Sequence, residues 1–384
     1  MNSATTAGIT CTEALRGKMN VNVDLHYSTC REFEISDGST GHGYDRVFAD
    51  CLDDKTWLDG GYHDMNLRRC KATTITIIRG RLLGEYTKRT EIGRGRYGVV
   101  FKAWNKMGKG WYAIKQVGPV DVADTKKSPN KVLREVHILA KLDHPHIVRY
   151  YDAWSEKPPP GEKLRWMDSN EPCLYIRMEW CSGPTLHEWL GQNQLPEQRP
   201  ISQTLDWFGQ LISAVKYIHD KSLIHRDIKP ENIFFGSSPN EVVPILKIGD
   251  FGLAIDVALS FSGACLSVVG TPSYMSPEQP SGHYTNSTDI FSLGLIFLEM
   301  VHPFKDAERD TVFWSLRLGK RHDVLDELDG KMNTLISWMT EVEPQKRATS
   351  SELENELRLA GPKLKRFPRE TQTIDPLCVT NGQV

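Results

Sequence analysis

The chain has 384 residues, a net charge of −2 and ordinary fractions of hydrophobic (39%) and charged (25%) side chains. This length leaves room for one large domain, or two small ones, plus extensions. The balanced charge gives no bulk attraction to nucleic acid or to an acidic membrane, and no apolar run reaches the roughly 18 residues that a membrane span requires. The first 20 residues lack the apolar core of a signal peptide. The eight cysteines form no CxxC pair, so we expect reduced thiols in a cytoplasmic or nuclear protein.

Residues 1–80 are polar, glycine-rich and weakly periodic, and we expect an extension of unknown role there. No membrane segment or nucleic-acid-binding module is evident in it. Four cysteines at near-even intervals have three histidines among them: Cys11, Cys30, Cys51, Cys70, His26, His42 and His63. These residues would permit a zinc site, but zinc ligands normally come in close pairs, which favours ordinary thiols.

The chain becomes clearly periodic from Tyr86 onward. Residues 97–103 and 111–117 alternate apolar and polar side chains, which predicts two paired strands joined by a turn over 105–110. Apolar residues at 132, 133, 136, 139 and 140 predict a helix over 132–142 with one buried face. Residues 155–172 contain three consecutive prolines and many charges, which is typical of an exposed loop.

Two more helices are predicted further along the chain. Apolar residues recur at helical spacing from Leu205 to Ile218 and indicate a helix with one buried face. Residues 291–300 are nearly all apolar and predict a helix that is buried on all sides. Residues 361–384 are polar and are expected to form a flexible tail.

A glycine-rich motif, GxGxxGxV, runs from Gly93 through Gly95 and Gly98 to Val100, between two predicted strands. Glycines let the backbone lie close to nucleotide phosphates and direct its N–H groups at them. Alone the motif is weak evidence, because a plain turn has the same composition. A strand follows it, which argues against a dinucleotide site, where a helix would begin.

The run His225-Arg226-Asp227-Ile228-Lys229-Pro230-Glu231-Asn232 is the most specific feature of the chain. It places a carboxylate, a cation and an amide oxygen on one short loop. These groups can orient a hydroxyl, neutralise a moving phosphoryl group and hold a magnesium ion. The run resembles the catalytic loop of protein kinases, and Asp250-Phe251-Gly252 follows it after a predicted strand over 245–248.

The resemblance to protein kinases implies a role for each polar residue. Lys115, in Ala113-Ile114-Lys115, would grip the α- and β-phosphates of ATP and pair with Glu135. Asp227 would orient the attacking hydroxyl and accept its proton, and Lys229 would steady the γ-phosphate. The metal ligands would be Asn232 and Asp250, whose hard oxygen atoms suit Mg²⁺.

The same resemblance implies the adenine site and the scaffold. The nucleotide would be enclosed by residues of the glycine motif, the following strands and the hinge: Ile92, Val100, Ala113, Met178, Glu179, Cys181 and Phe234. Glu278, in Ser276-Pro277-Glu278, would pair with Arg347. Asp289 would hold the catalytic-loop backbone.

The predicted fold is therefore α+β and two-lobed, with a kinase domain over residues 86–360. A small β-rich N-lobe would span about 86–180, a larger helical C-lobe would follow, and ATP and Mg²⁺ would bind between them. Lys229 and Thr271 are typical of serine/threonine kinases, because tyrosine kinases place an arginine near Asn232 instead. The alternative is that the residues of the catalytic loop form an ordinary solvated turn. The other kinase-like motifs in the chain disfavour it.

Several stretches resemble one branch, the kinases of the α subunit of translation initiation factor 2. They are residues 134–144, the hinge 174–181, and the segments 274–279 and 289–296. The resemblance implies that the chain phosphorylates this subunit to restrain translation under stress, with residues 308–319 as the substrate-docking helix. Arg81 and Glu85 have the spacing of the pair that joins two such domains back to back, although a surface i,i+4 pair is otherwise unremarkable.

Activation-segment phosphorylation is also implied. Arg134 and Arg226 would receive the phosphate. The available hydroxyls are Ser260, Ser262, Ser267 and Thr271.

Two departures from this branch leave alternatives open. The insert at 155–172 is short for the branch, and residues 1–80 contain no evident sensor module, so the activating stress is not specified. A serine/threonine kinase for other targets, such as cell-cycle proteins, is the main alternative. A pseudokinase scaffold is disfavoured because Lys115, Glu135, Asp227, Asn232 and Asp250 are all present.

Overall fold

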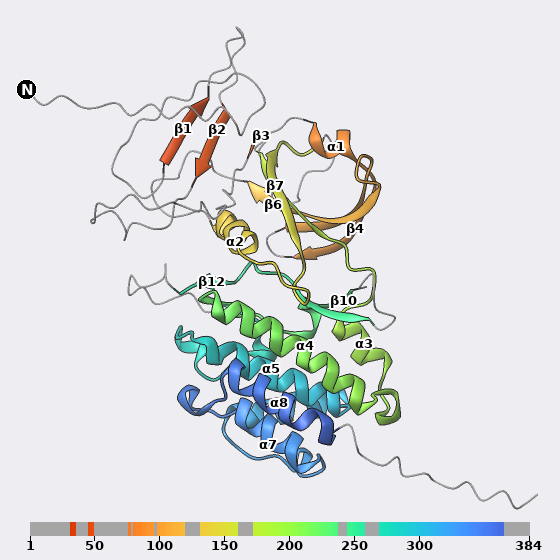
Figure 1. Cartoon of the computed structure of the whole chain (residues 1–384), viewed down its shortest axis with the longest axis vertical. Coiled ribbons are helices and arrows are strands. Elements are labelled where there is room, and N and C mark those ends of the chain that lie inside the picture. Colours follow the sequence, from red (N-terminus) through yellow and green to blue (C-terminus); the bar gives the residue numbers. More distant parts are fainter. Residues whose placement is uncertain are drawn as a thin grey trace, which may run out of the picture.

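The computed structural model describes residues 80–95, 98–119, 131–159, 172–236, 244–257 and 269–364, together with three earlier strands. Two of these, β1 (Arg31–Ile35) and β2 (Asp45–Ala49), pair antiparallel. Figure 1 shows a β-rich lobe above a larger helical lobe, which confirms the predicted two-lobed α+β fold. The cysteines and histidines considered for zinc lie outside the described residues. No helix within the described ranges is both long and apolar enough to cross a membrane.

The small lobe is built on one six-stranded sheet. Its strand order is β3 (Thr76–Ile77), β7 (Tyr150–Glu156), β8 (Cys173–Glu179), β6 (Gly110–Pro119), β5 (Gly98–Asn105) and β4 (Tyr86–Gly95). β3 runs parallel to β7, and the other neighbours are antiparallel. The pairing of β5 with β6 confirms the two strands that the alternating sequence pattern predicted.

Two helices accompany this sheet. α2 (Lys131–Ala140) confirms the helix predicted at 132–142, and α1 (Arg81–Glu85) precedes β4. Leu82 of α1 joins a small apolar cluster in which Trp154 stacks between Tyr86 and Tyr175, with ring centroids 6.0 and 5.4 Å away. Because side chains alternate along a strand, Ala113 and Lys115 share the opposite side of β6 from buried Ile114.

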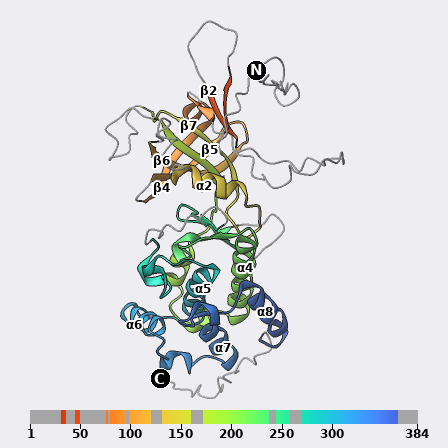
Figure 2. The same ribbon diagram turned by 90° about the vertical axis from the view of Figure 1, so that its left-hand side faces the viewer.

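The large lobe contains six α-helices in its described part. They are α3 (Leu186–Gln192), α4 (Ile201–Asp220), α5 (Asn286–Val301), α6 (Asp306–Arg317), α7 (Gly330–Met339) and α8 (Ser350–Leu364). Two short antiparallel pairs complete it: β10 (Ile233–Gly236) with β11 (Ile245–Ile248), and β9 (Leu223–Ile224) with β12 (Ile255–Asp256). Figure 2 shows these helices gathered around α5 beneath the sheet. α8 continues to Leu364, so the expected tail at 361–384 begins with four helical residues.

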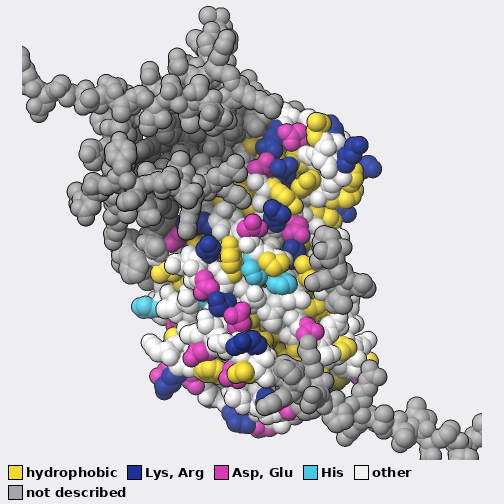
Figure 3. Space-filling model, in the orientation of Figure 1, with side chains coloured by type: hydrophobic (Ala, Val, Ile, Leu, Met, Phe, Trp, Pro, Cys, Tyr) yellow, Lys and Arg dark blue, Asp and Glu magenta, His cyan; other side chains and the backbone are white. Residues whose placement is uncertain are grey.

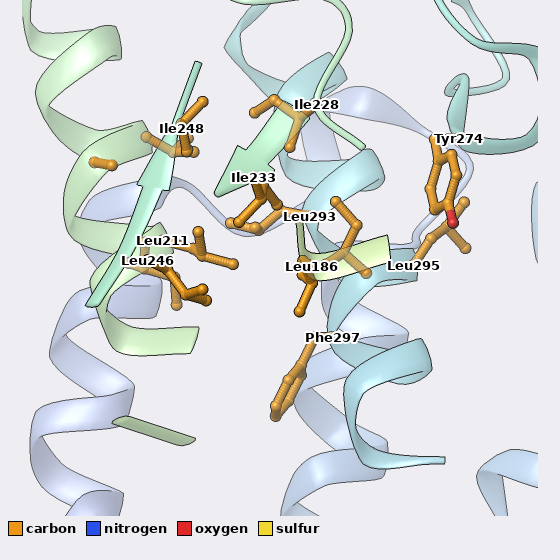
Figure 4. Packing of buried hydrophobic residues seen from close by; sticks show 14 of the residues in the cluster. Leu186, Leu211, Ile228, Ile233, Leu246, Ile248, Tyr274, Leu293, Leu295 and Phe297 are labelled. Atoms are coloured by element: carbon orange, nitrogen blue, oxygen red, sulfur yellow. The ribbon is translucent and has the colours of Figure 1, made fainter. Parts of the chain in front are cut away.

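α5 is the centre of the large lobe's core. Every residue from Phe291 to Met300 is buried, as the apolar run predicted. Phe297 stacks on Phe208 of α4 with ring centroids 3.9 Å apart. A Cβ on Gly294 would lie 2.8 Å from Cβ of Met339, so glycine is what allows α7 to approach. Figure 4 shows the α5 side chains packing beside those of α4, β10 and β11. This packed helix gives the catalytic loop a rigid support.

The described surface shows no dominant charge on the face drawn in Figure 3. Lysine and arginine side chains are interspersed with aspartate and glutamate over the large lobe. This mixture agrees with the net charge of −2.

Candidate active site

A cavity of about 170 Å³ lies between the two lobes. Its walls are mostly apolar and include all seven residues predicted for the adenine site: Ile92, Val100, Ala113, Met178, Glu179, Cys181 and Phe234. Four polar residues also line it: Lys115, Glu135, Asn232 and Asp250. An apolar pocket with a few convergent polar groups is the usual form of a cofactor site.

Three more residues line the cavity: Val148, Trp180 and Gly249. Trp180 lies within the predicted hinge, whereas Val148 and Gly249 were not predicted. Val148 and Gly249 come from segments about 100 residues apart, joined where the Val148 N–H donates to the Ile248 carbonyl at 2.9 Å. A Cβ on Gly249 would lie 2.9 Å from the Phe234 ring, so glycine is required there. The sequence held one signal for Gly249, which is its position directly before Asp250. For Trp180 the signal is its position between two hinge residues.

The glycine-rich motif forms the hairpin between β4 and β5, where Gly95 pairs with Gly98. A Cβ on Gly98 would lie 2.1 Å from the backbone oxygen of Gln116, whereas one on Gly95 would meet nothing within 4 Å. Gly98 therefore serves the close approach of β5 to β6, and Gly95 leaves open space beside the hairpin. Gly93, Gly95 and Gly98 do not line the cavity itself.

Lys115 joins three elements at one point. Its Nζ donates to Glu135 Oε1 at 2.7 Å and to Asp250 Oδ1 at 2.8 Å. Burial disfavours the charge on Lys115, but the two carboxylates prevail and raise its pKa above the ordinary value. The Lys115 charge lowers the pKa of Asp250 to about 2 against the effect of burial. Burial raises the pKa of Glu135, with Lys115 opposing it. The predicted Lys115–Glu135 pair is thus formed.

The catalytic loop places four polar groups within hydrogen-bonding distance. The Thr271 hydroxyl donates to Asp227 Oδ1 at 2.7 Å and accepts from Lys229 Nζ at 2.7 Å. Lys229 Nζ is also 3.3 Å from Asp227 Oδ2, and Asn232 Nδ2 donates to the same oxygen at 3.2 Å. Asp227 is therefore oriented from three sides. Thr271 was predicted only as a phosphorylation candidate and a mark of the serine/threonine class, and in this structure it orients the Asp227 carboxylate.

Asp289, at the start of α5, holds the loop backbone as predicted. One carboxylate oxygen accepts from the Arg226 N–H at 2.9 Å, and the other accepts from the His225 N–H at 2.9 Å and lies 3.0 Å from His219 Nε2. Burial alone would raise the pKa of Asp289, but hydrogen bonding and charge from His219, with further help from His225, lower it. The buried carboxylate is thus kept ionised by the groups it holds.

The loop and the Asp250 segment carry strained backbone. Arg226 (φ 68°) and Asp250 (φ 56°) adopt the left-handed conformation that residues with a Cβ seldom take. The next residue, Phe251, is buried against the His225 ring with centroids 4.8 Å apart, and His225 Nε2 lies 3.1 Å from the Gly249 carbonyl. Such strain persists only where the surroundings impose it, and it is concentrated at functional sites.

The predicted Glu278–Arg347 pair is also formed. Arg347 donates from two guanidinium nitrogens to the Glu278 carboxylate at 2.7 and 2.8 Å, and its side chain is fully buried. Burial would raise the pKa of Glu278, but the bonds from Arg347 lower it. This pair fixes the segment that follows Thr271 to the large lobe.

Asp250 and Asn232 fit the role of magnesium ligands. Both line the cavity, and the Asp250 side chain is half exposed. Asn232 donates through Nδ2 to Asp227, which leaves its amide oxygen as an acceptor. No group of three or more potential metal-ligating side chains occurs in the described part of the chain. Two protein oxygens suit Mg²⁺, which keeps water and phosphate in its shell.

The two arginines predicted to receive a phosphate lie close enough to interact. Burial lowers the pKa of Arg226 to about 10, with Tyr284 opposing and the positive charge of Arg134 contributing. The Arg226 guanidinium donates to the Leu253 carbonyl at 2.6 Å and lies over the Tyr284 ring at 4.9 Å. The hydroxyl candidates Ser260, Ser262 and Ser267 lie outside the described residues.

Arg81 and Glu85, predicted to join two domains back to back, form an i,i+4 ion pair within one chain. Arg81 Nε donates to Glu85 at 3.1 Å, and its Nη2 donates to Asp152 of β7 at 2.8 Å. The guanidinium also lies over the Trp154 ring at 4.4 Å. Arg81 thus already has partners in its own lobe.

Residues 86–357 match the protein kinase domain family, and the chain belongs to that family. Within it, the chain is 39% identical over 276 residues to the rat protein named "Interferon-induced, double-stranded RNA-activated protein kinase", covering 68% of this chain and 50% of that protein. It is 38% identical over 192 residues to the Caenorhabditis elegans "Eukaryotic translation initiation factor 2-alpha kinase pek-1" (47% of this chain, 18% of that protein). It is 32% identical over 271 residues to the Dictyostelium discoideum "Probable serine/threonine-protein kinase nek2", covering 68% of this chain and 60% of that protein. The chain spans about half the length of the interferon-induced relative.

Proposed function

We propose that this chain is an ATP- and magnesium-dependent serine/threonine kinase that phosphorylates the α subunit of translation initiation factor 2, restraining translation under stress. The observation that carries the kinase activity is the joining of Lys115, Glu135 and Asp250 in one cleft, beside an oriented Asp227 that is bonded to the cleft residue Asn232. The likeness to pek-1, whose name states this substrate, supports the choice of target.

Each residue of the cleft has a role in this proposal. Asp227 accepts a hydrogen bond from the attacking hydroxyl and takes its proton. Lys229 offsets charge on the γ-phosphoryl group, and Lys115 holds the α- and β-phosphates. A magnesium ion held by Asn232 and Asp250 would neutralise phosphate charge. Most of the rate enhancement would come from positioning and charge stabilisation.

The proposed location of the kinase is the cytoplasm, because its proposed substrate acts in translation there. A back-to-back homodimer through Arg81 and Glu85 is part of the proposal. Because Arg81 also binds Asp152, such a dimer would exchange or share an existing ion pair. Ultracentrifugation of the wild-type chain and of Arg81→Glu tests it: a dimer that persists in the variant would contradict this contact.

Phosphotransfer from labelled ATP tests the function. Purified initiation-factor α subunit is compared with a generic basic protein, each after preincubation of the kinase with ATP. We expect preferential labelling of the α subunit, and a loss of several orders of magnitude in Lys115→Ala and Asp250→Ala without unfolding. Arg321→Ala, which changes an exposed residue of the large lobe, is the matched control and should remain active.

A serine/threonine kinase for other targets is the second candidate, supported by the match to nek2. Label on the generic protein alone would favour it and reject the initiation-factor substrate. Label on neither protein would favour a pseudokinase scaffold. Wild-type activity in Lys115→Ala or Asp250→Ala would refute the roles given to these residues.

A further inference from the structure

Arg317, the last residue of α6, is bonded to the turn that follows Thr271. Its Nε donates to the Met275 carbonyl at 2.8 Å, and its Nη2 donates to the carbonyls of Pro272 and Ser273 at 3.1 and 2.8 Å. One side chain thus holds three of the four carbonyls from Pro272 to Met275. α6 and this turn are far apart in the sequence, and the Arg317 side chain links them.

This guanidinium has an unusual environment. Burial lowers the pKa of Arg317, and no carboxylate opposes that effect. Arg309, on the same helix, instead meets the carboxylates of Glu299 and Asp310. Placing a cation in a partly desolvated site against neutral carbonyls gains little stability. Its benefit is positional, because the planar guanidinium fork can fix several acceptors at once.

The turn that Arg317 holds leads directly to the reaction centre. The Thr271 carbonyl accepts from the N–H groups of Tyr274 and Met275 at 3.0 and 3.2 Å. The Thr271 hydroxyl donates to Asp227 at 2.7 Å. The carbonyls that Arg317 holds therefore belong to the same turn whose first residue orients the catalytic carboxylate.

The turn has a second attachment that does not involve Arg317. The Tyr274 ring meets Phe313 of α6 edge-on, with centroids 5.7 Å apart, and its hydroxyl donates to Glu299 at 2.6 Å. Removing the Arg317 guanidinium should therefore leave the turn attached to the large lobe. Its carbonyls would be free to reorient, which makes the effect separable from unfolding.

We propose that Arg317 is a positioning residue through which α6 sets the turn at 271–275 and, through Thr271, the alignment of Asp227. The inference rests on the proposed kinase activity, but not on the identity of the protein substrate. α6 thereby becomes part of the support of the active site as well as a surface helix.

Steady-state kinetics on a generic basic protein give the first test. We expect Arg317→Ala to lower kcat about 10-fold or more, as small misplacements of a reacting group do, with KM for ATP within about two-fold of wild type. Arg321→Ala, four residues on and bonded to exposed Asp326, should stay within two-fold in both. Thr271→Ala should lower kcat, and adding Arg317→Ala to it should cost little more, because both changes act through one path. The proposal would be overturned if the two losses in kcat multiplied fully in the double variant. A kcat for Arg317→Ala within two-fold of wild type would overturn it as well.

Hydrogen exchange gives a readout that does not need activity. In Arg317→Ala the amides of Tyr274 and Met275 should exchange about 10-fold faster or more, while those of β11 stay unchanged. Arg317→Lys, which keeps the charge but has a single nitrogen, should be intermediate and serves if the alanine variant fails to fold. Unchanged exchange at 274–275 in both variants would refute the inference. A wild-type chain that labels no substrate would defeat the proposed function while this measurement still decides the role of Arg317.

Discussion

Asp289→Asn tests how far the catalytic loop depends on one buried carboxylate. In the wild type the two oxygens of Asp289 accept from two backbone N–H groups and lie near His219. Asparagine keeps one oxygen and replaces the other by an NH2 group, which then faces a donor. The variant therefore loses at least one charge-assisted hydrogen bond and leaves a buried donor unsatisfied.

The size of the effect follows from these contacts. A hydrogen bond to a charged group contributes about 1.5–3 kcal/mol, and an unsatisfied buried donor costs about 1–3 kcal/mol. Together these give a loss of about 2.5–6 kcal/mol. At about 2–4 °C per kcal/mol for a domain of this size, Tm should fall by roughly 5–24 °C. The strained Arg226 backbone would lose its restraint, so kcat should fall as well.

Thermal unfolding by circular dichroism between pH 3 and 7 checks this prediction. The pKa of Asp289 is lowered in the folded protein, so its contribution is present above the ordinary value of about 3.9 and is lost as the pH falls through the lower folded value. The Tm difference between wild type and variant should therefore shrink toward pH 3. A variant whose Tm and kcat at pH 7 match the wild type would show that Asp289 does not hold the loop.

Two further predictions concern the small lobe. Lys115→Met removes the cation that opposes the raised pKa of Glu135, so this pKa should rise further. The folded variant then binds more protons than the unfolded chain, and its Tm should fall from pH 5 to pH 8 more than that of the wild type; parallel curves would refute the coupling. Gly98→Ala should destabilise the chain by about 1–3 kcal/mol, because its Cβ would lie 2.1 Å from the Gln116 oxygen. Gly95→Ala, which meets no atom within 4 Å, should keep the wild-type Tm in the same denaturation experiment.

The sequence predicted best those features that are encoded locally. The apolar run at 291–300 specifies a buried helix whatever its neighbours, because no face of it is polar. The order of Lys115, Glu135, Asp227 and Asp250 along the chain indicated the site, because these residues stand in motifs that resemble those of protein kinases. The structure brings Lys115, Glu135 and Asp250 to one cleft, and Asp227 is hydrogen-bonded to Asn232, which lines the same cleft.

Features that depend on distant contacts were not predictable. Asp152 comes 71 residues after Arg81, and nothing in the local pattern indicates that β7 would present it to that guanidinium. Gly249 is required by the Phe234 ring, a contact made only after β10 and β11 pair. Arg317 resembled any other cation at a helix C-terminus, where positive charge is common. In each case the partner is fixed by tertiary packing.

Thr271 shows how geometry can separate two roles that one residue type permits. A hydroxyl near Asp227 can be a phosphate acceptor or a hydrogen-bond donor, and this one donates at 2.7 Å. A phosphate on Thr271 would place nearly two negative charges against the Asp227 carboxylate, and Lys229 could offset only part of them. Thr271→Glu should therefore be inactive, Thr271→Ser should keep most of the activity, and Thr271→Ala should lie between them. An active Thr271→Glu variant, measured by phosphotransfer to the same protein substrate, would instead assign Thr271 to regulation by phosphorylation.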